Sequence, residues 1–244
     1  MRLKTIFYSA MLIALLCGCS LFSLERVPIA QRKLNLSRSG LKEIPAYVFE
    51  MSNLEVLRLY QNDISEIPKE ISKLKNLKKL YLGKNNLTHL PEVITELPNL
   101  ELLSVQYNNI DSITPYIYRA EKLEQIIMNH NALKSIPAAL GKLPNLKNLF
   151  LNFNHLGDIS DSAFNSGTLQ YLSLNRNFLK KLPVTISKCT NLKELYMVNA
   201  GPLVQLPESL CDLRRMDYLE IDRQVVVPQC LLVRQTTQLR IVVK

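Results

Sequence analysis

The chain has 244 residues, of which 47% are hydrophobic and 21% are charged, and its formal net charge is +9. This composition is that of one folded domain, and the basic balance points to acidic partners. With seven glycines and three histidines, a glycine-rich phosphate loop and a histidine metal cluster are both poorly supported.

The first residues have the pattern of an export signal. Arg2 and Lys4 precede an uncharged run from Thr5 to Leu16, which ends in Leu-Cys-Gly-Cys. A short basic region, an apolar stretch and a small-residue site predict a signal peptide over residues 1–18. The Leu-x-Gly-Cys sequence resembles the bacterial lipobox, and this resemblance implies that Cys19 receives the lipid and becomes the mature N-terminus.

Two alternatives remain for this segment. Residues 5–24 carry no charge and are long enough to cross a bilayer as an uncleaved anchor, or the cysteines are incidental in an ordinary secretory signal. All three interpretations export the rest of the chain. We expect a lipidated N-terminus and linker over residues 19–30, anchored to the bacterial outer membrane and either periplasmic or surface-exposed, because Ser20 is not acidic.

From residue 31 onward the sequence repeats every 23 residues. Each repeat carries Leu-x-x-Leu-x-Leu-x-x-Asn or a close apolar variant, as in residues 54–62 and 77–85. The asparagine register runs without a slip through Asn62, Asn85, Asn108, Asn131, Asn154 and Asn177. A fixed period of this length predicts a solenoid, whose coils bury their leucines only by stacking on one another. About nine repeats fill residues 31–227.

The pattern within each repeat predicts a short strand followed by a tight return. Alternation places Leu57 in the core and its neighbours Val56 and Arg58 on the outer face. The Ile-Pro or Leu-Pro pair that follows disfavours a long helix, so short helical or 3-10 turns are expected around residues 70–73 and 92–96. We expect each asparagine to satisfy backbone groups of its own coil and of the next one.

The motif resembles that of the leucine-rich repeat family, in the 23-residue Leu-Pro form of plant and animal Ras-associated proteins and of many bacterial surface proteins. The resemblance implies an α/β horseshoe with a concave parallel sheet and short turns on the convex side. Thr114 and Ser160 replace proline in two repeats, and an inserted residue predicts a turn at 199–202. Residues 228–244 are expected to form a C-terminal cap, closed by a strand in which Leu239, Ile241 and Val243 alternate.

Because the period is fixed, the outward strand positions form columns on the concave face. Large apolar residues gather in the central repeats, which predicts one exposed patch of Leu102, Tyr107, Ile127, His130, Phe150 and Phe153. Parallel sheets favour aromatic residues in any case, but that preference would spread them evenly. The other residues expected at this partner-binding face are Arg58, Tyr60, Tyr81, Lys84, Tyr171, Arg176 and Tyr196.

Aromatic anchors flanked by basic residues favour a protein or peptide partner, with an acidic glycan as an alternative. Export argues against a nucleic acid. We expect no catalytic residue, metal or cofactor, since no nucleophile motif or ligand spacing is present. The chain is therefore interpreted as a non-enzymatic binding protein of the cell envelope, in adhesion or host interaction. A passive, self-associating envelope component and an intracellular scaffold of the Ras-associated type are the alternatives.

Besides Cys19, three cysteines remain after the predicted cleavage. Cys189 occupies a register that holds leucine in other repeats, so we expect a small buried side chain. Cys211 and Cys230 fall on the return side of neighbouring coils, close enough for a disulfide in an oxidising compartment. The alternative is that both remain thiols.

Overall fold

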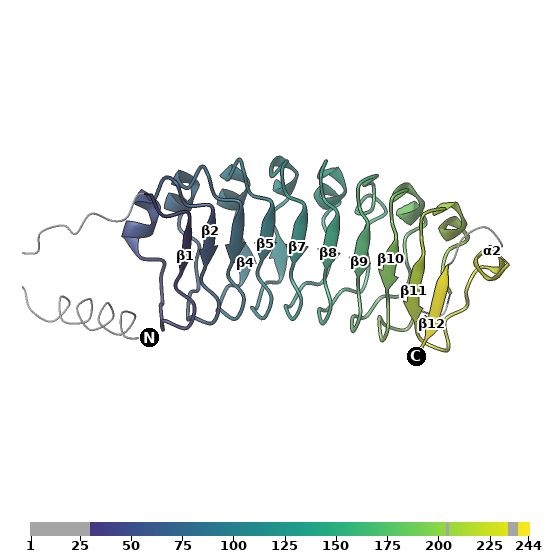
Figure 1. The fold of residues 1–244 in the computed structure, drawn as a ribbon. Helices are drawn as coiled ribbons and strands as arrows, with labels where there is room; N and C mark the ends of the chain where they lie inside the picture. The colour runs from purple at the N-terminus through teal and green to yellow at the C-terminus, as the bar shows by residue number, and fades with distance from the viewer. Residues whose placement is uncertain (1–29, 204, 234–238) are drawn as a thin grey trace, which may run out of the picture.

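The computed structural model describes residues 30–203, 205–233 and 239–244, which form one elongated array of stacked coils (Figure 1). The predicted signal peptide, Cys19 and the linker as far as residue 29 lie outside the described residues. No helix within the described ranges combines the length and the apolar character that crossing a membrane requires.

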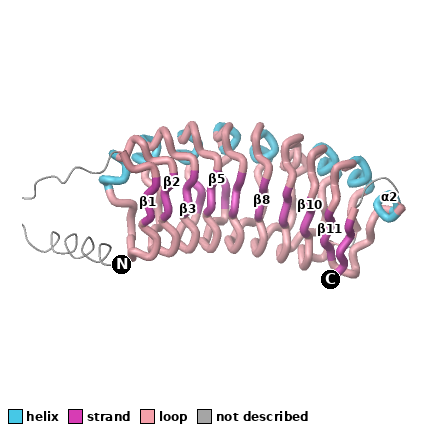
Figure 2. Tube along the Cα trace, in the orientation of Figure 1, coloured by secondary structure: helices cyan, strands magenta, loops and turns pink. Residues whose placement is uncertain are grey.

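Each coil contributes one short strand to a ten-stranded parallel sheet, as the period predicts (Figure 2). Neighbouring strands pair in register with the repeat, so that Leu57 lies opposite Leu80 and Leu80 opposite Leu103. The strands of this sheet, in spatial order, are β1 (Lys33–Asn35), β2 (Val56–Arg58), β3 (Lys79–Tyr81), β5 (Leu102–Ser104), β7 (Gln125–Ile127), β8 (Asn148–Phe150), β9 (Tyr171–Ser173), β10 (Glu194–Tyr196), β11 (Tyr218–Ile221) and β12 (Arg240–Val243). The predicted horseshoe-type parallel sheet is confirmed.

The return side of the coils carries short 3-10 turns, again as predicted. They are η1 (Ala46–Glu50), η2 (Lys69–Lys73), η3 (Glu92–Glu96), η4 (Ile117–Arg119), η5 (Ala138–Lys142), η6 (Val184–Lys188) and η7 (Glu208–Asp212). Six of them begin directly after a proline, which fixes φ and has no N–H to leave unpaired. Where Thr114 takes the proline register, η4 shrinks to three residues. A second, two-stranded sheet pairs β4 (His89–Leu90) with β6 (Ser112–Ile113).

The core is a continuous stack of leucine and isoleucine side chains between the sheet and the turns. Leu57 and Leu59 are fully buried, as are their equivalents in the following coils. Cys189 is buried in the same stack, as its register predicts, and its Sγ lies 3.2 Å from the carbonyl oxygen of Phe164. Burial raises the pKa of this thiol to about 11, so it stays protonated and unreactive at neutral pH.

The six asparagines form a ladder, but it runs in the opposite direction from the one expected. Asn108 Nδ2 donates to the carbonyl of Val105 in its own coil and to that of Leu82 in the preceding coil, at 2.9 and 3.0 Å. Its Oδ1 accepts the N–H of Leu87, also in the preceding coil. The N–H of Leu87 and the carbonyl of Leu82, which this side chain satisfies, therefore lie one coil back rather than one coil ahead.

The C-terminal end is closed by helix α2 (Gln229–Leu232) and by β12, which pairs with β11. Cys211 in η7 and Cys230 in α2 form a disulfide, with Cα atoms 5.9 Å apart. Gly201 in the inserted turn has φ +137, and a Cβ there would lie 2.2 Å from the nitrogen of Leu179. Only glycine fits at that position.

Candidate functional site

The residues expected at the partner-binding face lie on the sheet and at its edge, partly or fully accessible. Tyr107 and Phe153 are the most exposed of the central group, at 44% and 41%. Ile127 and Phe150 are half-buried and occupy adjacent strands in register. Leu102, one strand earlier in the stack, is also half-buried. The central repeats therefore present a contiguous apolar surface, which we call the apolar patch.

Outward register does not guarantee exposure. Val56, Ser104 and Ser173 belong to the outward columns, yet the structure buries all three. Their side chains are short, and that of Ser173 donates a hydrogen bond to Asn152 Oδ1 at 2.6 Å. The expectation that the whole of each column faces solvent is wrong at these positions.

One column of the apolar patch is a continuous stack of rings. The imidazole of His130 lies between the rings of Tyr107 and Phe153, with centroids 4.2 and 4.0 Å away and planes tilted by 12° and 17°. On the coil after Phe153, the guanidinium of Arg176 lies 5.0 Å from the centroid of the Phe153 ring. Each aromatic contact contributes about 0.5–1.5 kcal/mol beyond burial, so the stack holds its side chains in fixed positions.

The same column has an uncommon backbone conformation. Eight consecutive members, from Arg38 through Tyr107, His130 and Phe153 to Asn199, have φ between 52° and 60°. Each of the central N–H groups donates to the next coil, which holds the chain in this left-handed region. Glycine and asparagine adopt that region most easily, whereas a bulky residue there costs about 1–3 kcal/mol. The central repeats carry large rings where local stability favours small residues.

Charge around the patch is uneven. Burial lowers the pKa of His130, which favours the neutral form of its ring, and the guanidinium of Arg176 is the fixed charge beside the stack. Toward the N-terminus, the guanidinium of Arg58 lies 4.9 Å from the ring centroid of Tyr81. Lys84 is exposed nearby on the same coil as Tyr81. Positive charge therefore borders the apolar patch on both sides.

The remaining tyrosines of the face contact neighbouring residues or are half-buried. The ring of Tyr60 lies above Gly83, where a Cβ would come within 3.1 Å of it. The hydroxyl of Tyr196 donates to Glu194, and burial together with this carboxylate raises the pKa of the phenol. Tyr171 is half-buried on β9. These side chains form the flanks of the face.

A second row of asparagines lies beside the ring stack. Asn152 Oδ1 accepts the N–H of Asn175 at 2.8 Å, and Asn129 and Asn175 make the equivalent bond to the following coil. Among the described residues, none of the three Nδ2 groups has a hydrogen-bond partner. The apolar patch is thus bordered by amide donors that are held in place and available to a ligand.

Two residues of this surface were missed by the sequence reading. Phe178 is 59% exposed, and its ring centroid lies 5.9 Å from that of His155. Each of them directly follows a ladder asparagine. The residues at this position form a further column, beside the concave face. Reading that column across the repeats would have found them.

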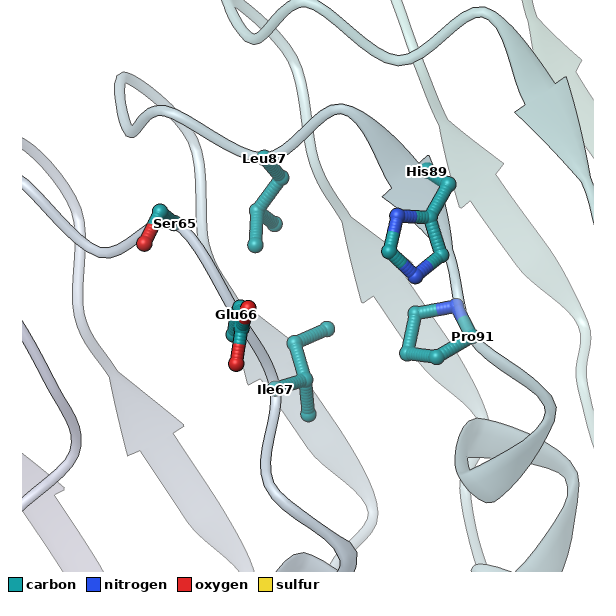
Figure 3. A pocket seen from close by; sticks show the side chains of 6 residues that line it. All are labelled: Ser65, Glu66, Ile67, Leu87, His89 and Pro91. Atoms are coloured by element: carbon teal, nitrogen blue, oxygen red, sulfur yellow. The ribbon is translucent and has the colours of Figure 1, made fainter.

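Outside the sheet, the structure offers little that suggests chemistry. The hollow in Figure 3 has a volume of about 260 Å³ and is lined by Ser65, Glu66, Ile67, Leu87, His89 and Pro91. Its two ionisable residues, Glu66 and His89, form no ion pair in the described structure. Within the described ranges, one group of side chains has metal-ligand spacing, Glu208 with Cys211 and Cys230. The disulfide occupies both sulfur atoms, so this group is no metal site.

Comparison with known families decides the classification. A family model described as a leucine-rich repeat region matches residues 32–167, more than half of the chain. The chain belongs to the leucine-rich repeat family. A second model, described as leucine rich repeat, matches residues 144–200, so the two together cover most of the ten-stranded sheet. None of the curated proteins matches this chain.

Solved structures give the same fold. The ectodomain of the plant membrane receptor kinase GASSHO1/SCHENGEN3 from Arabidopsis thaliana, in complex with CASPARIAN STRIP INTEGRITY FACTOR 2, matches with a TM-score of 0.65 and 31% identity. The match covers 76% of this chain and 23% of the ectodomain. An internalin (inlF) from Listeria monocytogenes matches with a TM-score of 0.72 and 16% identity, over 89% of this chain and 63% of the internalin. This leucine-rich repeat chain thus spans less than two thirds of either structure.

Proposed function

We propose that this protein is a non-enzymatic binding protein whose concave face holds a protein or peptide partner at the bacterial cell envelope. The observation that carries the proposal is the exposed ring stack of Tyr107, His130 and Phe153, built on left-handed backbone. Strained backbone under bulky, accessible side chains is typical of functional surfaces. The adjoining Ile127 and Phe150 supply apolar area, and aromatic anchors of this kind dominate binding energies.

The geometry of the stack favours a polypeptide over the acidic glycan. Both faces of the His130 ring are covered by its neighbours, and Phe153 lies between His130 and Arg176. Flat stacking on a sugar or a base needs a free ring face. A polypeptide can instead pack apolar side chains against ring edges and offer carbonyl groups to the amides of Asn129, Asn152 and Asn175. The solved relative with a bound factor is consistent with this use of the fold.

The proposed location is the cell envelope, to which a lipid on Cys19 would anchor the protein. Its support is the lipobox-like sequence at residues 16–19, and adhesion or host interaction is the role we propose for a surface location. Cys19→Ala should release the protein from membranes and abolish its labelling by a fatty-acid probe. Labelling that persists in this variant would contradict the lipid anchor while leaving the concave binding face untouched.

The binding face is tested by selective capture. Immobilised full-length protein is incubated with envelope and extracellular extracts, in parallel with the Phe150→Ala/Phe153→Ala double variant. Tyr116→Ala is the matched control, because Tyr116 is 40% exposed but lies on the return side, at the start of η4. A true partner is retained by wild type and by the control and is lost from the double variant. Against the purified partner, the double variant should bind at least about 2 kcal/mol more weakly.

Folding must be measured on the same proteins. Both phenylalanines project from the sheet, so the double variant should melt within a few degrees of wild type. Leu149→Ala points inward from a site that is 2% exposed and should cost about 2–5 kcal/mol. A double variant that is as unstable as Leu149→Ala would show that the rings are structural. If wild type forms a stable dimer that hides the patch, self-association replaces partner binding as the function.

A further inference from the structure

Five cations on the face of the first three strands have no acidic partner. Lys33, Arg38, Arg58, Lys79 and Lys84 are all exposed, and in the described part of the chain none of them forms an ion pair. We call these five residues the basic cluster. The two arginines contact neutral groups: Arg38 Nε donates to the side-chain oxygen of Gln61 at 3.2 Å, and the guanidinium of Arg58 lies over the ring of Tyr81.

Cations at other positions near the sheet do form ion pairs. One position before the strands, Glu55 lies between two cations, with Arg32 and Lys78 at 3.1 and 3.3 Å. Further along the solenoid, Lys147 pairs with Glu124, and Lys244 pairs with Glu220. A fixed period makes such coil-to-coil pairing easy, since residues in the same register of adjacent coils are neighbours in space. Its absence from the basic cluster leaves five like charges repelling one another.

The arrangement of the cluster is regular. Lys33 and Lys79 occupy the same column two strands apart, through the pairing of both with Val56. Arg38 and Lys84 occupy another column, also two coils apart, and Arg58 lies on the strand between. Strands are about 4.8 Å apart, so four cations bound an area about 10 Å wide with a fifth inside it. That area accommodates a ligand with several negative charges.

We propose that the basic cluster binds the acidic segment of a polypeptide whose adjoining apolar segment occupies the apolar patch. This proposal rests on the proposed function and adds the chemistry of the partner and the direction in which it lies along the sheet. The cluster ends at β3 and the patch begins at β5, the next strand of the sheet, so one extended ligand can contact both.

Two other polyanions fit less well. A membrane surface is flat and cannot enter a concave sheet. A sulfated polysaccharide carries negative charge along its whole length and has no apolar segment for Ile127 and Phe150. A polypeptide can carry its acidic residues in one segment and its apolar residues in the next, and so can match both the basic cluster and the apolar patch.

The test uses the full-length protein and labelled synthetic peptides. The block peptide has a run of glutamates followed by a leucine- and phenylalanine-containing segment, and the second peptide has the same residues in alternating order. The variant is Lys79→Gln with Lys84→Gln. The control is Lys78→Gln with Lys147→Gln, which removes the same charge from lysines that are already paired with carboxylates.

The block peptide should bind at least about tenfold more tightly than the alternating one, and the Lys79/Lys84 variant should lose about tenfold while the control loses little. Binding should also weaken as salt is raised above about 0.1 M, because exposed charges are screened there. Equal losses in the variant and the control would overturn the proposal, since net charge alone would explain binding. Preferential binding of heparin over the block peptide would also overturn it. A glutamate-only peptide should bind the Phe150→Ala/Phe153→Ala variant as tightly as wild type. Its binding therefore tests the basic cluster separately from the binding role proposed for the apolar patch.

Discussion

Replacing Asn108 by alanine removes one rung of the asparagine ladder at the centre of the solenoid. Its Nδ2 bonds go to the carbonyls of Leu82 and Val105, but each of these also accepts a bond from a neighbouring ladder asparagine, Asn85 or Asn131. Neither carbonyl is therefore orphaned. The N–H of Leu87 has no second acceptor, because it donates only to Asn108 Oδ1, at 3.0 Å in a buried position.

The expected loss follows from that single buried donor. Leaving one buried N–H unpaired costs about 1–3 kcal/mol, and for a domain of this size each kcal/mol lowers the melting temperature by about 2–4 °C. Asn62→Ala should cost less. Its Oδ1 accepts from Ser39 and Leu41 in partly buried positions at the end of the array, where water can take over.

Urea unfolding followed by circular dichroism measures the difference, and an unchanged slope against urea shows that the unfolding unit is the same. Asn109→Ala is the control, since this neighbouring side chain is exposed and makes no hydrogen bond in the described structure. If Asn108→Ala unfolds no more easily than Asn109→Ala, the asparagine ladder does not satisfy the buried backbone groups.

Two further predictions concern the C-terminal coils. Gly201→Ala should destabilise the protein by more than about 3 kcal/mol, because φ is +137 and the new Cβ would collide with Leu179. Gly40→Ala is the control and should cost about 1 kcal/mol, because φ is +65 and nothing lies within 4 Å of the new Cβ. Thermal melts in which Gly40→Ala is the less stable variant would contradict the clash. Replacing Cys211 and Cys230 by serine should lower the unfolding free energy by about 3 kcal/mol, since the disulfide closes a loop with a sequence separation of 19. A reductant should lower the melting temperature of wild type and leave that of the serine variant unchanged.

The repeat pattern of the sequence is sufficient to predict the fold. The 23-residue period, the leucine positions and the asparagine register each repeat so often that a single arrangement buries them all, and the strands and 3-10 turns lie where the period places them. The apolar patch was predictable for the same reason: side chains in one register of successive coils must become neighbours in space.

Tertiary structure decided what periodicity does not encode. The outward register of Ser104 does not reveal that it is buried, and the asparagine register does not reveal that the side chains bond to the preceding coil. The ring stack at His130 needs side-chain orientations set by left-handed backbone. The unpaired state of the basic cluster likewise requires knowing which carboxylates come within reach. A period fixes which coils are adjacent, whereas exposure, ring contact and ion pairing depend on distances of a few ångströms between individual side chains.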